Sequence, residues 1–305
     1  MRCVSQIMLA FSATFVAVSL AHGGPQGSYG GGAKAPQGQQ SQQGQTQEQA
    51  QPAGPVISNE EKAAFMAIQN ELDPDKAIQL VGDFEKKFPS STLLSSAYAF
   101  ASNSAQRKGD LPTAVGYGEK SLKLSPDNVQ SLMIMAYILP QPQVLRANEA
   151  DKEKKLTDAE KYANRALEML AQPVNPNLVK PATDTDDQFK KRKDNWASGM
   201  HSSLGMIHLQ RSSMALVPPD HDELAKAEQE YKLAVTMTDR PDAVDYYRLG
   251  DAYALDGKTD EGIDAYTKAS QIGQGTVIQN YADQRVGQLK AAKKKMEDDK
   301  AQAKH

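Results

Sequence analysis

Cysteine, aromatic residues and excess positive charge are all scarce in this 305-residue sequence. Cys3 is the only cysteine, aromatic residues make up 6% of the chain, and the formal net charge is −3. A single cysteine excludes an intramolecular disulfide and a cysteine-based metal cluster. The net charge argues against a general nucleic-acid binder, whose footprint is a basic patch or stripe. We therefore expect a fold stabilised by packing alone.

Long apolar runs are also scarce, and the one that stands out lies at the N-terminus. A basic residue precedes the run from Ile7 to Leu20, and Ser19 and Ala21 have the spacing of a cleavage site. A helix of that length rises about 21 Å, short of the roughly 30 Å hydrocarbon core of a bilayer. We expect residues 1–21 to be a signal peptide that exports the chain to the periplasm or outside the cell. An uncleaved membrane anchor is the alternative; after cleavage we expect no stable membrane insertion.

The next segment, residues 22–57, is rich in Gly, Gln and Pro and has almost no apolar side chains. Such a composition cannot bury enough surface to offset the entropy of ordering it. We expect a disordered spacer, with a binding role for its Gln tract as the alternative.

From residue 58 onward the apolar and small residues recur with helical periodicity. Near the C-terminus, Leu249 and Gly250 fall on one face of a helix, Asp256–Gly257 marks a turn, and Tyr266 and Ala269 fall on one face of a second helix. A glycine within a helix costs about 1 kcal/mol relative to alanine, which indicates a close packing contact. The pattern predicts a helical hairpin.

Copies of this hairpin occur upstream. Residues 95–128 repeat the layout, with Gly109 at the turn. Two further copies, beginning near Val129 and around Leu204, carry long insertions between their two helices, and residues 58–94 form a degenerate first copy. A final helix is expected from Thr276 to about Lys295.

This arrangement resembles the tetratricopeptide repeat (TPR), a helical hairpin of 34 residues with the pattern W-x2-L-G-x2-Y and then A-x3-F. The resemblance implies an all-α, right-handed superhelix of about five antiparallel pairs plus a terminal helix over residues 58–295, with a flexible tail over 296–305. A helical bundle without repeats is the competing interpretation. The expected repeat-packing residues are Tyr98, Gly109, Ala114, Leu204, Gly205, Leu249, Gly250, Tyr253, Gly257, Tyr266 and Ala269.

Patterns typical of catalysis or metal binding are missing from the sequence. G-x-S-x-G, H-E-x-x-H and phosphate-binding loop motifs do not occur. His201 and His208 lie seven residues apart, not at the four-residue spacing of zinc-binding helices, and they occupy positions where the repeat places aromatic residues. We expect them to be packing residues, and we predict no cofactor, no metal and no enzymatic activity.

Repeats of this kind stack into an extended concave face. By position, the resemblance implies that the residues lining this groove, and contacting a peptide, are Asn103, Gln106, Arg107, Met133, Tyr137, Met206, Gln210, Tyr247 and Asp251. Some family members hold a peptide carboxylate with a Lys–Asn pair, but Ala99 stands where that Lys would be, so this clamp is not predicted. The groove is expected to be nearly neutral.

The sequence thus favours an exported scaffold that binds a protein or peptide partner, with no role in nucleic-acid binding. The alternative is a structural envelope protein that self-associates through its end repeats. The identity of the partner is not encoded in any motif found here.

Overall fold

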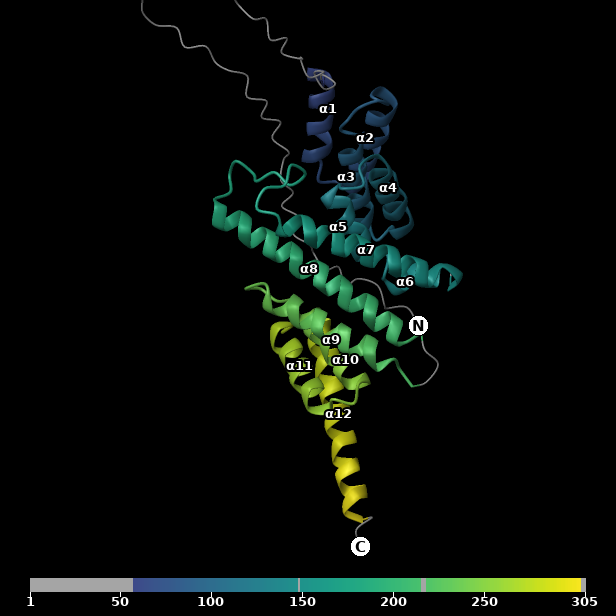
Figure 1. Cartoon of the computed structure of the whole chain (residues 1–305), viewed down its shortest axis with the longest axis vertical. Helices are drawn as coiled ribbons and strands as arrows, with labels where there is room; N and C mark the ends of the chain where they lie inside the picture. Colours follow the sequence, from purple (N-terminus) through teal and green to yellow (C-terminus); the bar gives the residue numbers. More distant parts are fainter. Residues whose placement is uncertain (1–56, 148, 215–217, 303–305) are drawn as a thin grey trace, which may run out of the picture.

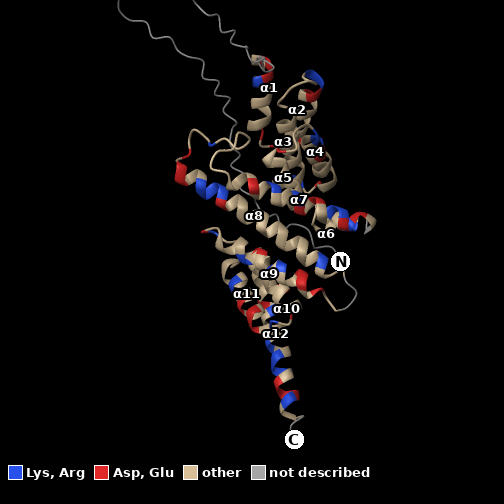
Figure 2. Ribbon diagram, viewed as in Figure 1, with Lys and Arg blue, Asp and Glu red and all other residues tan. Residues whose placement is uncertain are grey.

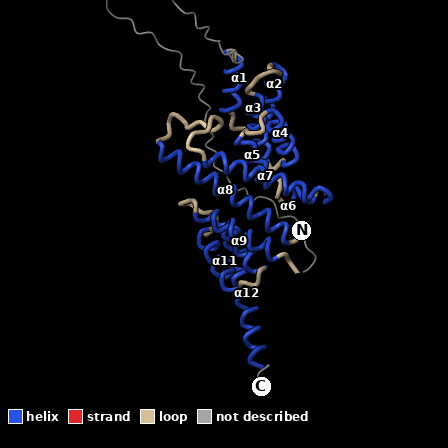
Figure 3. Tube along the Cα trace, viewed as in Figure 1, coloured by secondary structure: helices blue, strands red, loops and turns tan. Residues whose placement is uncertain are grey.

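The computed structural model describes residues 57–147, 149–214 and 218–302. Within these ranges every regular element is a helix and no strand occurs (Figures 1 and 3). The predicted signal peptide and nearly all of the predicted spacer lie outside the described residues. No helix in the described part combines the length and the apolar character needed to cross a bilayer.

The helices fall into five antiparallel pairs followed by one terminal helix, as the sequence predicts. They are α1 (Asn59–Asn70), α2 (Pro74–Lys87), α3 (Leu94–Lys108), α4 (Leu111–Leu124), α5 (Val129–Ile138), α6 (Pro142–Arg146), η1 (Glu149–Asp151), α7 (Lys152–Ala171), α8 (Asp186–Ser212), α9 (His221–Thr236), α10 (Ala243–Leu255), α11 (Thr259–Ile272) and α12 (Val277–Gln302). The pairs are α1/α2, α3/α4, α5/α7, α8/α9 and α10/α11, and each also contacts the next pair. The chain forms a TPR-like stack that extends from α1 and α2 at one end to α12 at the other (Figure 1).

The first long insertion is not simply a loop. It contains the short helix α6 and the 3-10 turn η1, which lie between the two helices of the third pair. Leu145 of α6 is buried in the core, and the ammonium group of Lys155 donates to the main-chain carbonyl of Val144 at 2.9 Å. Sequence periodicity missed α6 because five residues are too few to show a helical period.

The N-terminus of α8 is fixed by a capping box. The Thr185 hydroxyl accepts from the Gln188 main-chain N–H at 3.2 Å, and the Gln188 side chain accepts from the Thr185 main-chain N–H at 2.8 Å. Asp186 and Asp187 in the first turn add negative charge at the positive end of the helix dipole. These signals allow α8 to begin well before the fourth repeat pattern, and α8 is the longest helix among the described residues.

Two glycines on first helices are packed by tyrosine rings from the second helix of the same pair. A Cβ atom at Gly205 would lie 2.9 Å from the Tyr231 ring, and one at Gly250 would lie 2.7 Å from the Tyr266 ring. Both tyrosines are completely buried. The sequence predicts a close contact at Gly250 with both Tyr253 and Tyr266 beside it. Tyr266 is in that place, but Tyr253 is only partly buried. It packs toward α9 instead, where the Lys232 ammonium lies 5.2 Å from its ring centroid.

The other predicted packing residues follow the repeat. Gly109 and Gly257 sit in the predicted turns with φ of 78° and 77°, a left-handed conformation that glycine adopts without strain. Buried packing positions are Tyr98, Ala114, Leu204, Leu249 and Ala269.

The terminal helix α12 caps the stack. Val277 lies one 34-residue repeat after Ala243, so α12 occupies the place of a sixth first helix. The stripe that would meet a second helix is polar or small and largely exposed; it consists of Asn280, Asp283, Gln284 and Gly287. A polar outer face is what a terminal repeat requires. The helix continues to Gln302, so the boundary predicted at 295 falls inside it, and Figure 2 shows basic and acidic residues interspersed along its projecting end.

Candidate interaction surface

The predicted peptide-binding residues lie on the first helices of four successive pairs. Asn103, Gln106 and Arg107 are on α3; Met133 and Tyr137 on α5; Met206 and Gln210 on α8; Tyr247 and Asp251 on α10. Most are partly buried, whereas Arg107 is exposed and Met206 is 9% exposed.

The structure gives packing roles to two of these residues, Arg107 of α3 and Met133 of α5. A guanidinium nitrogen of Arg107 donates to the main-chain carbonyl of Leu72 at 2.8 Å, so this side chain fastens α3 to the turn between α1 and α2. Met133 packs against the core cluster shared by α5, α7 and α8. Asn103, Gln106 and Gln210 stay candidates on their position alone.

The remaining candidates converge around a residue that the sequence reasoning missed, Arg248 of α10. One of its guanidinium nitrogens contacts the sulfur of Met206 on α8. Burial raises the pKa of the Tyr137 hydroxyl on α5, and the charge of Arg248 acts against that rise. Three repeats and the terminal helix α12 therefore contribute to one surface. It is here called the first-helix surface and consists of Tyr137, Ser202, Met206, Asp242, Asp245, Tyr247, Arg248, Asp251 and Arg285.

Two aspartates lie beside Arg248 near the start of α10. The Ser202 hydroxyl donates to Asp245 at 2.5 Å, and burial raises the pKa of the Asp245 carboxyl to about 6. Burial also raises the pKa of Asp242, against the effect of the Val244 main-chain N–H, which donates to its carboxylate at 2.8 Å. The charge of Arg248 lowers the pKa of both carboxyls.

A third aspartate, Asp251, is held by the chain itself. The Tyr266 hydroxyl donates to its carboxylate at 2.5 Å, and Arg285 of α12 lies 3.3 Å from the same oxygen. Burial nevertheless raises the pKa of Asp251. Tyr247 packs edge-on against Tyr266 with ring centroids 5.2 Å apart. Asp251 and Tyr247 thus also serve the packing of α11, and their predicted role in contacting a peptide stays a prediction.

The charge of this surface differs from the sequence prediction. A nearly neutral surface was expected, yet Asp242, Asp245, Asp251, Arg248 and Arg285 meet on it. A signal for one of them was present, because Arg285 lies one 34-residue repeat after Asp251. Arg248 lies beside Tyr247 and Asp251 on the side of the helix away from the packing stripe, so helical periodicity could have found it.

The two histidines of α8 are buried or partly buried, as expected of packing residues, but each also pairs with a carboxylate of α9. His201 Nδ1 lies 2.7 Å from Glu230 and His208 Nδ1 lies 2.7 Å from Glu223. Among the described residues, no group of three or more His, Cys, Asp or Glu side chains could hold a metal ion.

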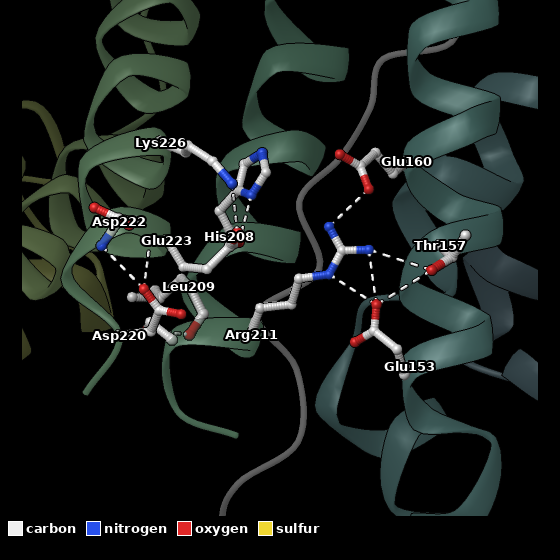
Figure 4. A network of polar contacts seen from close by, with 11 residues as sticks. Glu153, Thr157, Glu160, His208, Leu209, Arg211, Asp220, Asp222, Glu223 and Lys226 are labelled. Carbon is white, nitrogen blue, oxygen red and sulfur yellow. Dashed lines mark hydrogen bonds and ion pairs between the residues drawn. The ribbon is translucent and has the colours of Figure 1, made fainter. Parts of the chain in front are cut away.

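His208 belongs to a larger polar network that joins α7, α8 and α9 (Figure 4). Glu223 also accepts from Lys226 at 2.6 Å. One turn further along α8, Arg211 donates to Glu160 of α7 at 2.6 Å and to Glu153 at 3.0 Å. The contacts of Arg211 hold α7 against α8, and the contact of His208 holds α8 against α9. We assign both a structural role.

A cavity of about 630 Å³ lies away from the first-helix surface, lined by α4, the turn after it, α5 and α7. Arg165 in its wall donates to Asp127 at 2.8 and 2.9 Å and to Glu168 at 3.0 Å. Lys123 and Lys161 also line this cavity, but the first-helix surface gathers side chains from several repeats and is the stronger candidate site.

No protein-family model matches this chain, and no curated protein matches it. Solved structures similar to it include a thermophilic TPR protein of Thermus thermophilus, at 15% identity and a TM-score of 0.47 over 74% of this chain and 98% of that one. A MamA RS-1 double mutant is 13% identical, with a TM-score of 0.43 over 71% and 96% of the two chains. BtubC (BKLC) from P. vanneervenii is 16% identical, with a TM-score of 0.43 over 70% and 78%. At such identities and TM-scores these likenesses carry no argument about function, and the repeat architecture rests on the helix contacts described above.

Proposed function

We propose that this chain is an exported scaffold that binds a segment of another protein along the first-helix surface, in a binding role without a catalytic step. The observation that carries the proposal is the contact between Met206 and Arg248 from two successive repeats, with Tyr137 of the preceding repeat close enough for the charge of Arg248 to act on its hydroxyl. Tyrosine and arginine are among the residue types most often found to dominate binding energy at interfaces, and methionine adapts to varied apolar partners.

Export to the periplasm or the cell exterior belongs to the same proposal. It is supported by the apolar run from Ile7 to Leu20 and the small residues after it. Fractionation of cells that express the full chain, with N-terminal sequencing of the product, tests it. Retention of residues 1–21 in a membrane fraction would favour the uncleaved anchor.

Site-specific photocrosslinking tests the binding proposal directly. A photoreactive residue at Gln210, on the same helix as Met206, should crosslink a partner in envelope extract. The matched control is Lys86 of α2, whose side chain is 82% exposed and distant in the fold. We expect crosslinks from position 210 that weaken in a Tyr247→Ala background and no corresponding product from position 86.

Self-association through the end repeats is the alternative outcome. Sedimentation of the chain alone over a concentration series distinguishes it, because a self-associating protein changes its apparent mass without a partner. A monomer at all concentrations, combined with specific crosslinks at position 210, supports the scaffold.

A further inference from the structure

We propose that Arg248 makes the first-helix surface selective for non-acidic segments rich in hydrogen-bond acceptors, and that Asp242, Asp245 and Asp251 around it exclude acidic ones. The inference rests on the proposed function and names the chemistry of the partner. It follows from which hydrogen-bonding groups on this surface are already used and which are not.

The acceptors of the surface are partly used by the fold. Asp245 accepts from Ser202, Asp242 accepts from the main-chain N–H at Val244, and Asp251 accepts from Tyr266. Asp245 is also only 8% exposed. Each of these bonds engages the Oδ1 atom, so the fold uses only part of the acceptor capacity of each carboxylate.

The donors of Arg248 are not used in the same way. Guanidinium presents five N–H groups. Across the described residues, its one hydrogen-bonding contact of good geometry is with the sulfur of Met206, a weak acceptor, and none of its nitrogens lies within 4.0 Å of a carboxylate oxygen. The buried Tyr231 hydroxyl, which has no other hydrogen-bond partner, lies beside Arg248 and offers one of its donors an acceptor within the fold. A half-buried guanidinium in this position gains from any acceptor that a partner supplies.

The sign of the local charge decides which acceptor fits. Three carboxylates surround Arg248, and within the described part of the chain only one other cation, Arg285, forms an ion pair with any of them, at Asp251. A carboxylate on the partner would be attracted by Arg248 but repelled by the three aspartates. A main-chain carbonyl or a side-chain amide has the acceptor oxygen without the charge, so an extended segment containing Gln, Asn, Ser or Thr satisfies both conditions.

Selection from a random dodecapeptide library displayed on phage, with the full chain as bait, tests the proposal. We expect the selected sequences to be depleted in Asp and Glu. A selected peptide, synthesised with blocked ends and labelled, should lose about tenfold in affinity when one central Gln is changed to Glu, because the three aspartates repel the added carboxylate.

Protein variants assign the effect to Arg248. Arg248→Met should weaken the binding of the parent peptide by about tenfold or more, while Arg146→Met, which removes an exposed arginine of α6 outside the surface, should leave it unchanged. Asp242→Asn combined with Asp245→Asn should restore most of the affinity for the Glu-containing peptide. If Arg248→Met fails to fold by circular dichroism, Arg248→Lys is used, which keeps the charge but loses the forked donors and should bind at an intermediate level.

The outcomes separate the two proposals. If the library yields no peptide, or only peptides indifferent to Tyr247→Ala, the proposed function and this inference both fail. If binding depends on Tyr247 but tolerates Arg248→Met, or if acidic peptides are preferred, the surface binds partners and the role given to Arg248 is wrong.

Discussion

The Tyr266 ring lies so close to Gly250 that a Cβ atom there would be 2.7 Å from it. The ring is also held at its hydroxyl by Asp251 and Arg285. The same glycine–tyrosine contact recurs one pair earlier, between Gly205 and Tyr231. These two contacts set how closely the helices of each pair approach.

Gly250→Ala and Gly205→Ala should therefore destabilise the protein although alanine favours helix. Overpacking costs about 1–3 kcal/mol, and the gain in helix propensity recovers about 1 kcal/mol of it. Gly287→Ala in α12 is the matched control, since its Cβ would meet nothing within 4 Å. It should raise the free energy of unfolding, by about 0.5–1 kcal/mol. Urea denaturation measures all three; an unchanged midpoint for Gly250→Ala would contradict the close contact.

Tyr266→Ala should cost far more stability than Tyr253→Ala. Tyr266 is completely buried, and truncating such an aromatic ring costs about 3–5 kcal/mol. Tyr253 is only partly buried and lies under Lys232, so we expect about half that cost or less. Thermal melts of the two variants check the order. Equal losses would mean that Tyr253 contributes to the contact predicted for it from the sequence.

Asp245→Asn should alter the dependence of stability on pH. The Asp245 pKa is about 6 in the folded protein against 3.8 as its ordinary value, so the folded state binds this proton more tightly than the unfolded chain. Its contribution to stability is present below about pH 4 and is lost as the pH rises to about 6. Asparagine keeps an oxygen for Ser202 and removes the buried charge. The variant should gain about 1–3 kcal/mol relative to the parent at pH 7 and little at pH 4. If the stability difference between the variant and the parent is the same at pH 4 and pH 7, the pKa of Asp245 is not raised in the folded protein.

Arg211→Met should weaken the attachment between α7 and α8. Arg211 is 17% exposed and holds Glu160 and Glu153, so its loss leaves two carboxylates without their cation. We expect a cost of about 1–2 kcal/mol, discounted for solvent screening. Lys86→Met is the control, because the Lys86–Asp83 pair is 82% and 60% exposed and should contribute under about 0.5 kcal/mol. Chemical denaturation in low and high salt compares them; equal effects would argue against the network of Figure 4.

Zinc and a chelator should leave the melting temperature unchanged. The Nδ1 atom of His201 faces Glu230, and that of His208 faces Glu223. The two histidines lie two turns apart on α8, which is not the spacing of two histidines that bind one zinc ion. A ligand that binds only the folded state at a hundredfold excess over its Kd would add about 2.7 kcal/mol, which a melt resolves easily. A zinc-dependent rise that disappears in His208→Gln would overturn the structural assignment of these pairs.

The sequence by itself determined the repeat. Helical periodicity, the turns at Gly109 and Gly257 and the glycine at 250 are local signals, because each depends on residues within one or two helical turns. They were enough to predict five pairs, a terminal helix and the line of residues along the first helices. The short helix α6 and the true length of α12 escaped, since neither carries a long apolar period.

Only the tertiary structure decided what gathers on the first-helix surface. Tyr137, Met206 and Arg248 come from three repeats, and their meeting depends on the angle between successive pairs, which no single repeat encodes. The same holds at Gly250. The sequence predicts both Tyr253 and Tyr266 beside this glycine, but the crossing of the two helices places Tyr266 against it and leaves Tyr253 facing α9. Periodicity fixes which face of a helix is buried, but the residues that meet across that face depend on interhelical geometry set by all the packed side chains together.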